Sequence, residues 1–185
     1  MSSLAAVILI VGLGNPGGQY VLNRHNVGFM AADILAHDYN AGSESSKFSG
    51  LLRSATVDGK KVLLLKPQTY MNLSGESVQK AMQFYKIKPE HVIVIHDEID
   101  LPAAEVRAKQ GGGHAGHNGL RNIDQHIGKN YHRIRIGVGH PGNKDDVSNY
   151  VLQNFSKEEQ NTWLPEVLAD IPNVLEDVLD QINKD

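Results

Sequence analysis

The residues best suited to acid–base chemistry in this sequence are one histidine and one acid, His25 and Asp97. An imidazole titrates near neutral pH and can therefore take a proton from water. A neighbouring carboxylate can fix the tautomer of the imidazole and stabilise the cation that forms. His25 also lies in the first turn of a predicted helix, where the helix dipole favours the neutral base. The two residue types predict a soluble hydrolase that uses water as its nucleophile.

The residues alone leave simpler interpretations of both side chains open. His25 also fits a surface histidine at the start of a helix, and Asp97 fits a strand-end cap in an acidic turn with Glu98 and Asp100. For a lone histidine the surface interpretation is the favoured one. If His25 acts as a base, water is the natural nucleophile, because the chain has no cysteine and no serine stands in a nucleophile-elbow pattern. The lack of cysteine also removes disulfides and thiolate metal sites, which suits a reducing cytoplasm.

A metal site is the main alternative for the histidines. His114 and His117 are spaced like metal ligands, and His96 with Asp97 would be further donors. The pair lies in a glycine loop and not on a helix face, and it lacks the H-E-x-x-H pattern. We therefore expect no metal and no cofactor.

Amide side chains follow several of the predicted strands. In open α/β sheets, sites form beyond the carboxyl ends of the strands. The candidates are Asn15 after the first strand, Asn72 with Tyr70 after the strand 61–66, and Asn118 in the glycine-dense loop 111–119. The residues alone also allow Asn72 and Asn118 to cap the helices that follow, and Tyr70 to belong to the core.

The motif Gly12-Leu13-Gly14-Asn15-Pro16-Gly17 matches the dinucleotide-binding pattern of glycines and follows a strand. Pro16 disfavours helical geometry at Asn15, so no helix can open directly onto a pyrophosphate. The acid that should close a second strand, Asp33, falls inside a predicted helix. A tight turn is the better interpretation, and a nicotinamide oxidoreductase becomes the second choice.

The hydrophobic patterns predict one domain over residues 1–185, an α/β fold in which helices flank a twisted mixed β-sheet. Asp58-Gly59 predicts a hairpin turn, and Ser156 with Glu159 predicts a capping box. Arg133 and Arg135 share one face of their strand, opposite its buried face. The expected strands are 7–12, 51–57, 61–66, 92–96 and 133–138, and the expected helices are 24–38 with Asn23 as N-cap, 74–85, and a C-terminal region to 182 that Pro165 and Pro172 should break or kink.

The net charge of −3 argues against a generally basic coat for nucleic acid, but the charge is unevenly distributed. Residues 105–145 hold seven bases and three acids, a local charge of +4, whereas residues 156–185 hold two bases and eight acids, a local charge of −6. The basic stretch is suited to phosphates or is simply a solvated face. The apolar run from Leu4 to Val11 is too short to span a bilayer, so no membrane association is expected.

Together these loops closely resemble bacterial peptidyl-tRNA hydrolase, in order and over residues 7–155. No single block is specific, but six blocks in register are. The matching blocks are Asn15-Pro16-Gly17, Arg24-His25-Asn26-Val27-Gly28, Tyr70-Met71-Asn72-Leu73-Ser74-Gly75, His96-Asp97-Glu98-Ile99-Asp100-Leu101-Pro102, the loop 111–119, and Gly139-His140-Pro141-Gly142.

The resemblance implies a monomeric cytoplasmic enzyme that cleaves the ester between a peptide and the 3′ end of tRNA in peptidyl-tRNA released early from the ribosome. By matching position, His25 is the general base on water and Asp97 supports it. The other implied roles are substrate and water binding by Asn72 and Asn118, recognition of the peptide by Asn15, stacking near the tRNA terminus by Tyr20 and Tyr70, and binding of the 5′ phosphate region of the acceptor stem by Lys109 and Arg135.

The sequence departs from the family pattern in three places. Ala115 stands where the family usually has glycine, and Ala103-Ala104 replaces a proline-glycine turn. The tail is short and acidic where family members often run longer and more basic. A non-catalytic RNA-binding module on the same fold remains an alternative, although binding alone would not need both His25 and Asp97.

Overall fold

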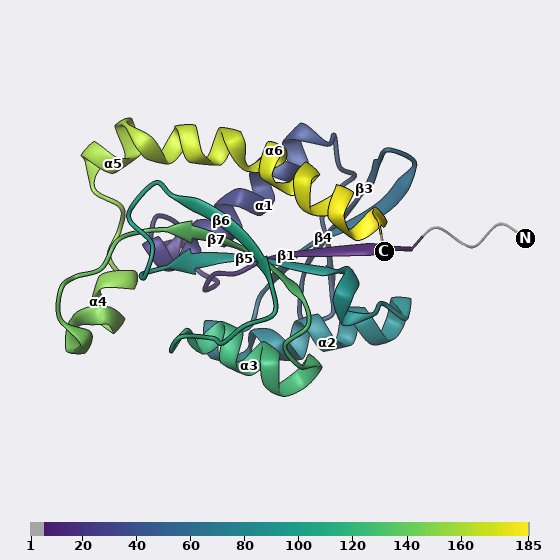
Figure 1. The fold of residues 1–185 in the computed structure, drawn as a ribbon, viewed down its shortest axis with the longest axis horizontal. Helices are drawn as coiled ribbons and strands as arrows, with labels where there is room; N and C mark the ends of the chain where they lie inside the picture. The colour runs from purple at the N-terminus through teal and green to yellow at the C-terminus, as the bar shows by residue number, and fades with distance from the viewer. Residues whose placement is uncertain (1–5, 185) are drawn as a thin grey trace, which may run out of the picture.

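One seven-stranded sheet organises the computed structural model, which describes residues 6–184 (Figure 1). The strand order is β2-β3-β4-β1-β5-β7-β6. The strands β4, β1, β5 and β7 run parallel. β3 pairs antiparallel with β4, β2 with β3, and β6 with β7. The strands are β1 (Ile8–Gly12), β2 (Ser45–Lys47), β3 (Gly50–Val57), β4 (Lys60–Pro67), β5 (Val92–Glu98), β6 (Val106–Gln110) and β7 (His132–Gly137).

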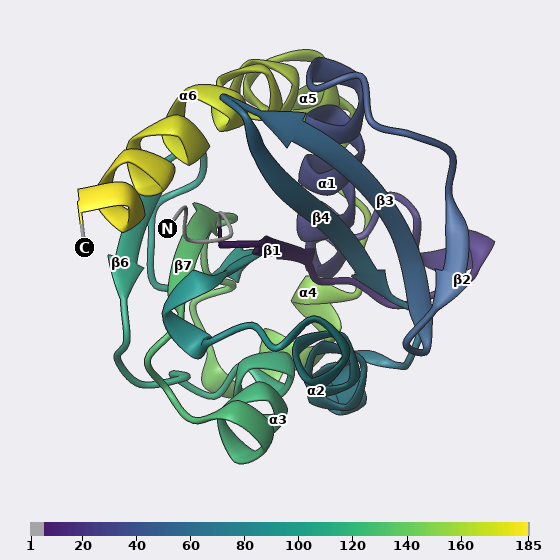
Figure 2. The ribbon, with the colours of Figure 1, turned by 90° about the vertical axis from the view of Figure 1, so that its right-hand side faces the viewer.

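Helices cover both faces of this sheet. In Figure 1, α1 and α6 lie above it and α2 and α3 below it, and Figure 2 gives the same layers from the side. The helices are α1 (Val27–Asp38), α2 (Ser74–Tyr85), α3 (Asn118–Ile127), α4 (Val147–Val151), α5 (Lys157–Asn161) and α6 (Trp163–Lys184), with 3₁₀ turns η1 (Gly18–Tyr20), η2 (Arg24–Asn26), η3 (Met71–Leu73), η4 (Pro89–His91) and η5 (Lys144–Asp146).

Two apolar clusters hold these layers together, one on each face of the sheet. Alternate residues of each central strand belong to opposite clusters, as in β5, where Ile93 and Ile95 face α1 and α6 while Val92 and Val94 face α2 and α3. A strand buried on both faces reads as a continuous apolar run, which is why β1 and β5 lack the polar alternation of a surface strand. The carboxyl ends of these buried parallel strands lie along one edge of the sheet. Because the strands are held on both faces, the starting points of the loops that follow them are also held in place.

The predicted α/β fold and its mixed sheet are confirmed, as are the hairpin and the capping box. Val57 pairs with Lys60 across the turn Asp58-Gly59, and Ser156 Oγ accepts from the Glu159 N–H at 3.1 Å. The predicted helix 24–38 is present as η2 followed by α1. The strands β2 and β6 were not predicted, because both are short and mostly exposed and lack an apolar pattern.

The expectation that the prolines break the C-terminal helix is wrong, because α6 continues through both of them from Trp163 to Lys184. The alternative expectation, a kink, agrees with the change in direction of α6 midway along its length (Figure 1). Pro165 lies in the first turn, where its missing N–H has no partner in the helix in any case. Pro172 lies inside, but neighbouring residues such as Ile171 and Leu175 are fully buried against the sheet. Packing of this stripe outweighs the local preference of proline.

The prediction that Arg133 and Arg135 share the face opposite the apolar one is correct, but this face of the strand is also covered. Arg133 is 1% exposed, and its guanidinium donates to the carbonyls of Gly112 and Gly113 at 2.8 and 2.6 Å. It also lies 3.5 Å from the Asp124 carboxylate of α3. Arg133 therefore holds the glycine-dense loop against the sheet.

Among residues 6–184, no helix is long and apolar enough to cross a membrane. Of the apolar run considered for a membrane span, Leu4 and Ala5 lie outside the described residues, and so does Asp185 of the acidic tail.

Candidate active site

His25 lies beyond the carboxyl ends of β1 and β5, in the short turn η2 that precedes α1. Glycine allows this turn to come so close to the sheet. A Cβ on Gly28 would lie 2.3 Å from the Ile95 carbonyl oxygen, and one on Gly12 would lie 2.2 Å from the Gly28 carbonyl oxygen. Two glycines in contact therefore seat the start of α1 directly on the strand that carries Asp97.

The imidazole of His25 is bound to the Asp97 carboxylate. Nδ1 lies 2.8 Å from Oδ2 and 3.0 Å from Oδ1. Since an ionised carboxylate only accepts hydrogen bonds, Nδ1 carries the proton in neutral His25 and donates it. The ring nitrogen left to act as a base is Nε2, which has no hydrogen-bond partner within residues 6–184.

A second histidine, His117, completes this cluster. Its Nε2 lies 2.9 Å from Asp97 Oδ1, and its ring centroid is 5.0 Å from that of His25. Its Nδ1 accepts from the backbone N–H groups of Gly119 and Leu120, so it caps α3. Because Nδ1 accepts, Nε2 must donate to Asp97. The carboxylate thus receives two N–H groups, and each histidine has a fixed tautomer.

The charges of this cluster shift its pKa values in opposite directions. Burial acts to lower the pKa of His25, but the Asp97 charge and the hydrogen bond to it outweigh burial and raise the pKa. Burial acts to raise the pKa of Asp97, but His25 and His117 hold it well below its usual range. The expectation that the helix dipole keeps His25 neutral is therefore wrong in sign: the buried carboxylate dominates and favours the cation.

His96 lies on the other face of β5 and does not act on this carboxylate. Its Nδ1 donates to the Asp97 carbonyl oxygen at 2.7 Å, and its ring lies edge-on to His117 at 5.1 Å between centroids. Burial, with His117 and Arg133 nearby, lowers the pKa of His96 to about 3. His96 is a neutral packing partner of His117 at neutral pH.

The cluster opens into a cavity of about 460 Å³. Three of the predicted site residues line it, namely His25, Asp97 and Asn118. Its other lining residues come from the end of β5 and the segment after it, from the loop before α3, from α3 and from residues 140–151, and they include Glu98, Asp100, Arg121, His140, Lys144 and Val147. Acids, bases and apolar side chains thus border the histidine pair.

Asn15 lies behind the cavity and joins two loops. Its Oδ1 accepts from the Met71 N–H at 2.7 Å. Its own backbone exchanges hydrogen bonds with the side chain of Asn26, at 2.8 and 3.0 Å. The residue is 8% exposed. It therefore ties the turn of His25 to the loop of Asn72, whose side chain is exposed.

The remaining predicted residues lie outside the cavity lining. Tyr70 is 58% exposed beside Asn72, and Tyr20 is half-buried in η1. Lys109 and Arg135 lie on β6 and β7 at one edge of the sheet, where Lys109 faces Arg133 and Arg135 faces Arg107. The structure does not bring these four into contact with the histidine pair.

The residues weighed as an alternative metal set, His96, Asp97, His114 and His117, do not come together as ligands. His114 Nδ1 accepts from the Gly116 N–H within its own loop, and His96 faces away. Within the described chain, the one group whose ligand atoms all lie within 4.8 Å is His25, Asp97 and His117. A metal there would require a lone pair on His117 Nε2, which would put a proton on Nδ1 against two N–H donors. The observed hydrogen bonds disfavour a metal ion.

The glycine motif also fails as a dinucleotide site. A Cβ on Gly14 would lie 2.6 Å from the ring of Phe29, so α1 fills the space over the loop. Its glycines serve close packing and a turn, in which Gly17 has a φ of 116°. This supports the prediction of a structural turn.

The turn of His25 is also bound to a distant segment. The Arg24 guanidinium lies 2.8 Å from the Glu159 carboxylate and stacks 4.2 Å from the Tyr150 ring centroid. Asn23 Nδ2 donates to Asn154 Oδ1 at 2.8 Å, and Phe155 N–H donates to the Leu22 carbonyl. This junction of residues 22–24 with 150–159 connects η2 to α4, one side of the cavity. It also explains why Asn23 does not cap the helix with its side chain.

Two alanines keep the backbone that glycine favours. Ala115 has a φ of 50° and Ala104 a φ of 75°. Both lie at the positions where the resemblance places glycine. The loop geometry is therefore retained at the cost of local strain.

His117 is the residue whose role the sequence did not predict. Its spacing from His114 pointed to a metal, whereas its contact with Asp97 spans 20 residues. The available signal was its place directly before Asn118 at the start of a helix, a position suited to an N-cap.

The chain resembles known proteins along nearly its whole length. A family model described as Peptidyl-tRNA hydrolase matches residues 9–185. A peptidyl-tRNA hydrolase of Rhodospirillum centenum is 58% identical over 160 residues, which are 86% of this chain and 70% of that protein. One from Cereibacter sphaeroides is 54% identical over 163 residues, 88% and 72% of the two chains.

Solved structures agree with these relatives. The crystal structure of peptidyl-tRNA hydrolase from Acinetobacter baumannii matches with a TM-score of 0.82 and 43% identity over 99% of this chain and 97% of that one. An MTA/SAH nucleosidase, at 8% identity and a TM-score of 0.54, shares the fold alone. The sheet, the histidine–aspartate pair and these matches define a hydrolase of α/β architecture. More specifically, the chain belongs to the peptidyl-tRNA hydrolase family.

Proposed function

We propose that this enzyme hydrolyses the ester that joins a peptide to the 3′-terminal ribose of tRNA, and so recycles peptidyl-tRNA released early from the ribosome. The observation that carries the proposal is the His25–Asp97 pair at the cavity, with Nδ1 bound at 2.8 Å and Nε2 left as a base. Family membership supplies the substrate class. In the reaction, water adds to the ester carbonyl and the bond to the ribose oxygen breaks.

His25 acts as the general base in this scheme. Its Nε2 takes a proton from water as the water oxygen attacks the carbonyl carbon, and later returns the proton to the leaving ribose oxygen. Asp97 stabilises the imidazolium that exists between these two steps. His117 is a positioning residue, because its N–H donates to Asp97 and keeps the carboxylate ionised and oriented. The products are a peptide carboxylate and a tRNA with a free 3′ hydroxyl.

Neutral amides complement this base. Asn118 lines the cavity next to His117, and its N–H groups are suited to the oxyanion that develops on the carbonyl. An amide can do this without competing for the proton that His25 transfers. Asn72 has the same chemistry on the neighbouring loop, and Asn15 fixes that loop relative to His25. We assign Asn72 to substrate binding and Asn15 to recognition of the peptide.

The tRNA is proposed to approach from the edge formed by β6 and β7. Lys109 and Arg135 lie on these adjacent strands, and Arg135 is only half-buried. Phosphates of the acceptor stem would neutralise the like charges gathered there. Tyr70, which is 58% exposed, and Tyr20 are suited to stack on bases near the 3′ end.

Hydrolysis of N-blocked aminoacyl-tRNA tests the chemistry directly. We expect His25→Ala to lose about 10²–10⁴-fold in rate, because the general base is gone. Asp97→Asn should lose part of the rate, since an amide cannot support the imidazolium as a carboxylate does. Both variants should bind the tRNA normally. His37→Ala and Asp38→Asn, exposed positions on α1, are the controls. Full activity of His25→Ala would end the proposal.

We further propose that the enzyme works as a monomer in the cytoplasm and that residues 1–185 form one domain. All residues assigned to the site come from one chain, so a second copy is not required to complete it. Light scattering of the purified protein tests this. A stable dimer that loses activity on dilution would contradict it.

A further inference from the structure

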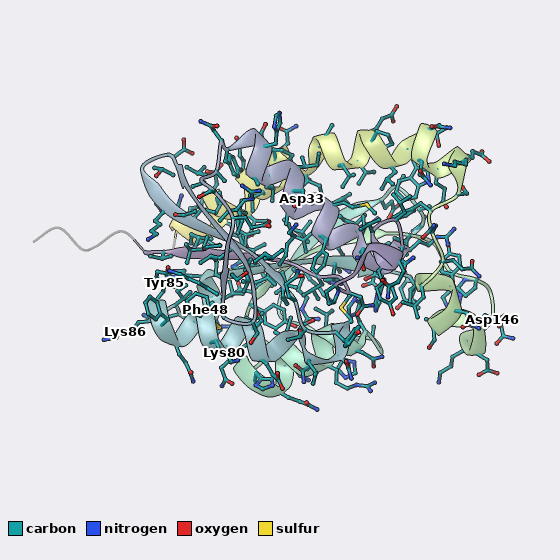
Figure 3. The ribbon with its side chains drawn as sticks, turned by 180° about the vertical axis from the view of Figure 1, so that it is seen from behind. Asp33, Phe48, Lys80, Tyr85, Lys86 and Asp146 are labelled. Carbon is teal, nitrogen blue, oxygen red and sulfur yellow. The ribbon has the colours of Figure 1, made fainter. Side chains whose placement is uncertain are left out.

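Three aromatic rings gather on the surface between α2 and the turn from β2 to β3. We name this surface the aromatic seam; it consists of Phe48, Phe84 and Tyr85. Ring centroids lie 5.4 Å apart for Phe48–Phe84, 5.9 Å for Phe48–Tyr85 and 4.9 Å for Phe84–Tyr85. Figure 3 shows Phe48 and Tyr85 near each other, with Lys80 and Lys86 beside them. Phe84 is 67% exposed, so a large apolar ring faces solvent.

The turn that carries Phe48 is strained. Lys47 pairs with Gly50, so Phe48 and Ser49 form a two-residue turn in which φ is 58° and 55°. Such turns favour glycine, asparagine and aspartate, and a bulky residue at positive φ is unusual. Strain of this kind persists where something else benefits from the geometry. Here it holds an aromatic ring against the exposed Phe84.

Lysines surround the aromatic seam. Residues 45–88 contain eight bases and two acids, and two of these bases, Arg53 and Lys66, are paired with Glu44 and Asp33 outside this stretch. Lys61 Nζ lies 5.2 Å from the Tyr85 ring centroid, and Lys80 Nζ donates to Ser49 Oγ at 2.8 Å. Lys47 and Lys86 adjoin the rings in sequence. Within residues 6–184, none of these four lysines lies within 4.0 Å of a carboxylate.

We propose that the aromatic seam binds an unpaired segment of RNA. Bases stack on aromatic rings, and lysines without acidic partners attract the backbone phosphates. An apolar protein partner would explain the exposed Phe84 but not the surrounding positive charge. An exposed ring, Phe84, backed by two half-buried rings and flanked by lysines without acidic partners is typical of surfaces that bind single strands without sequence preference.

This RNA is a separate strand and not the substrate's acceptor stem. The strands next to the seam and to Lys109 are β2 and β6, the two opposite edges of the sheet. Six spacings of about 4.8 Å place these edges nearly 30 Å apart. RNA that enters at the β6 edge ends at the scissile ester near His25, and the substrate continues beyond it as peptide. This choice of strand rests on the proposed function, whereas RNA binding at the seam does not.

Anisotropy of a short, labelled oligouridylate tests binding. We expect Phe84→Leu to weaken it about tenfold, because leucine keeps an apolar side chain but loses the stacking face. Phe84→Trp should restore binding, and the new tryptophan fluorescence should be quenched by the oligonucleotide. In Lys86→Ala the slope of log binding constant against log salt concentration should become shallower by about 0.7, because one phosphate contact is lost. Lys157 is an exposed lysine of α5, and Lys157→Ala should leave the slope unchanged.

Hydrolysis assays separate this inference from the proposed function. Phe84→Leu should cleave peptidyl-tRNA at the normal rate, and the oligouridylate should not compete with the substrate. The inference is overturned if the wild type does not bind oligouridylate, if Phe84→Leu binds it normally, or if binding is lost in Lys109→Ala instead. Failure of the wild type to hydrolyse peptidyl-tRNA would overturn the proposed function and leave the anisotropy result intact.

Discussion

At the scale of single residues, the site is defined by one carboxylate that accepts from two histidines. His25 and His117 differ in what their second nitrogen does. In His117 it accepts from backbone N–H groups of α3, so this ring is fully engaged. In His25 it remains available, so the two chemically equal side chains have different roles. The backbone around a histidine therefore decides which one is available as a base.

The pH dependence of hydrolysis should report the raised pKa of His25. Only the neutral imidazole is a base, so kcat/KM should rise with pH and level off above a pKa higher than 6.5. In Asp97→Asn the rising limb should move to lower pH, because burial then acts on His25 without the opposing charge. Rate measurements between acid and neutral pH check this. If the rising limb of the pH profile is at the same pH in Asp97→Asn and in the wild type, a group other than His25 controls it.

The raised pKa of His25 also affects stability, but stability falls with rising pH where activity increases. Because the folded-state pKa of His25 is raised, its contribution to stability is complete below 6.5 and is lost as pH rises through the folded value. The enzyme therefore becomes active as this stabilisation disappears.

At the scale of elements, two features set the position of the site: close contacts between glycines and loops in strained conformations. Gly12 and Gly28 allow α1 to begin directly on the sheet, and left-handed Ala104 and Ala115 preserve loops beside the cavity. The contacts at Gly12 and Gly28 involve backbone atoms, so they cannot adjust to a larger side chain. The strain at Ala104 and Ala115, in contrast, can be relieved if glycine replaces alanine.

Glycine at the two strained alanines should stabilise the protein. We expect Ala104→Gly and Ala115→Gly each to add about 0.5–1 kcal/mol, since the relief of left-handed strain exceeds the extra entropy of the unfolded chain. The melting temperature should rise by roughly 2 °C for each. Ala103→Gly, a neighbour without positive φ, is the control and should give no gain. Equal effects at Ala103 and Ala104 would contradict the explanation.

A side chain at Gly28 should displace the turn that carries His25. The new Cβ of Gly28→Ala would lie 2.3 Å from the Ile95 carbonyl oxygen and 2.5 Å from the Leu13 nitrogen. We expect a loss of about 3 kcal/mol in the free energy of unfolding and a large loss of hydrolysis. Gly18→Ala meets no atom within 4 Å and should be neutral. Denaturant unfolding and rate assays check both variants, and a fully active Gly28→Ala would refute the proposed seating.

At the scale of the whole molecule, the substrate is much larger than the site, so charge at a distance must contribute. The cavity and the β6–β7 edge are separate features, and the proposed function assigns chemistry to one and tRNA binding to the other. This separation predicts that the two can be altered independently.

Lys109→Ala should weaken tRNA binding without affecting the chemistry. We expect KM for peptidyl-tRNA to rise. The slope of log binding constant against log salt concentration should become shallower by about 0.9, the value for one lost contact to a duplex phosphate. Hydrolysis of a minimal ester that lacks the acceptor stem should be unchanged. Lys157→Ala serves as the control. Equal losses on both substrates would contradict the assignment.

Much of the fold and part of the site could be predicted from sequence. Continuous apolar runs and turn signals identified β1, β3, β4 and β5, since burial on both faces and turn chemistry are local properties. The continuity of α6 at Pro172 and the burial of Arg133 could not be predicted, because packing and hydrogen bonds from distant residues decide them. The role of His117 was not predicted for the same reason. The proximity of His25 and Asp97 came from family motifs, because no local pattern encodes a contact over 72 residues.

The junction of residues 22–24 with 150–159 has a consequence for how the protein is made. Synthesis proceeds from the N-terminus, so His25 emerges early, whereas Glu159, the partner of Arg24, follows 135 residues later. Contacts so distant in sequence form only after the intervening chain is available. The turn that presents His25 is therefore completed only after residue 159 has been synthesised. Until then a nascent copy carries His25 without the support that orients it.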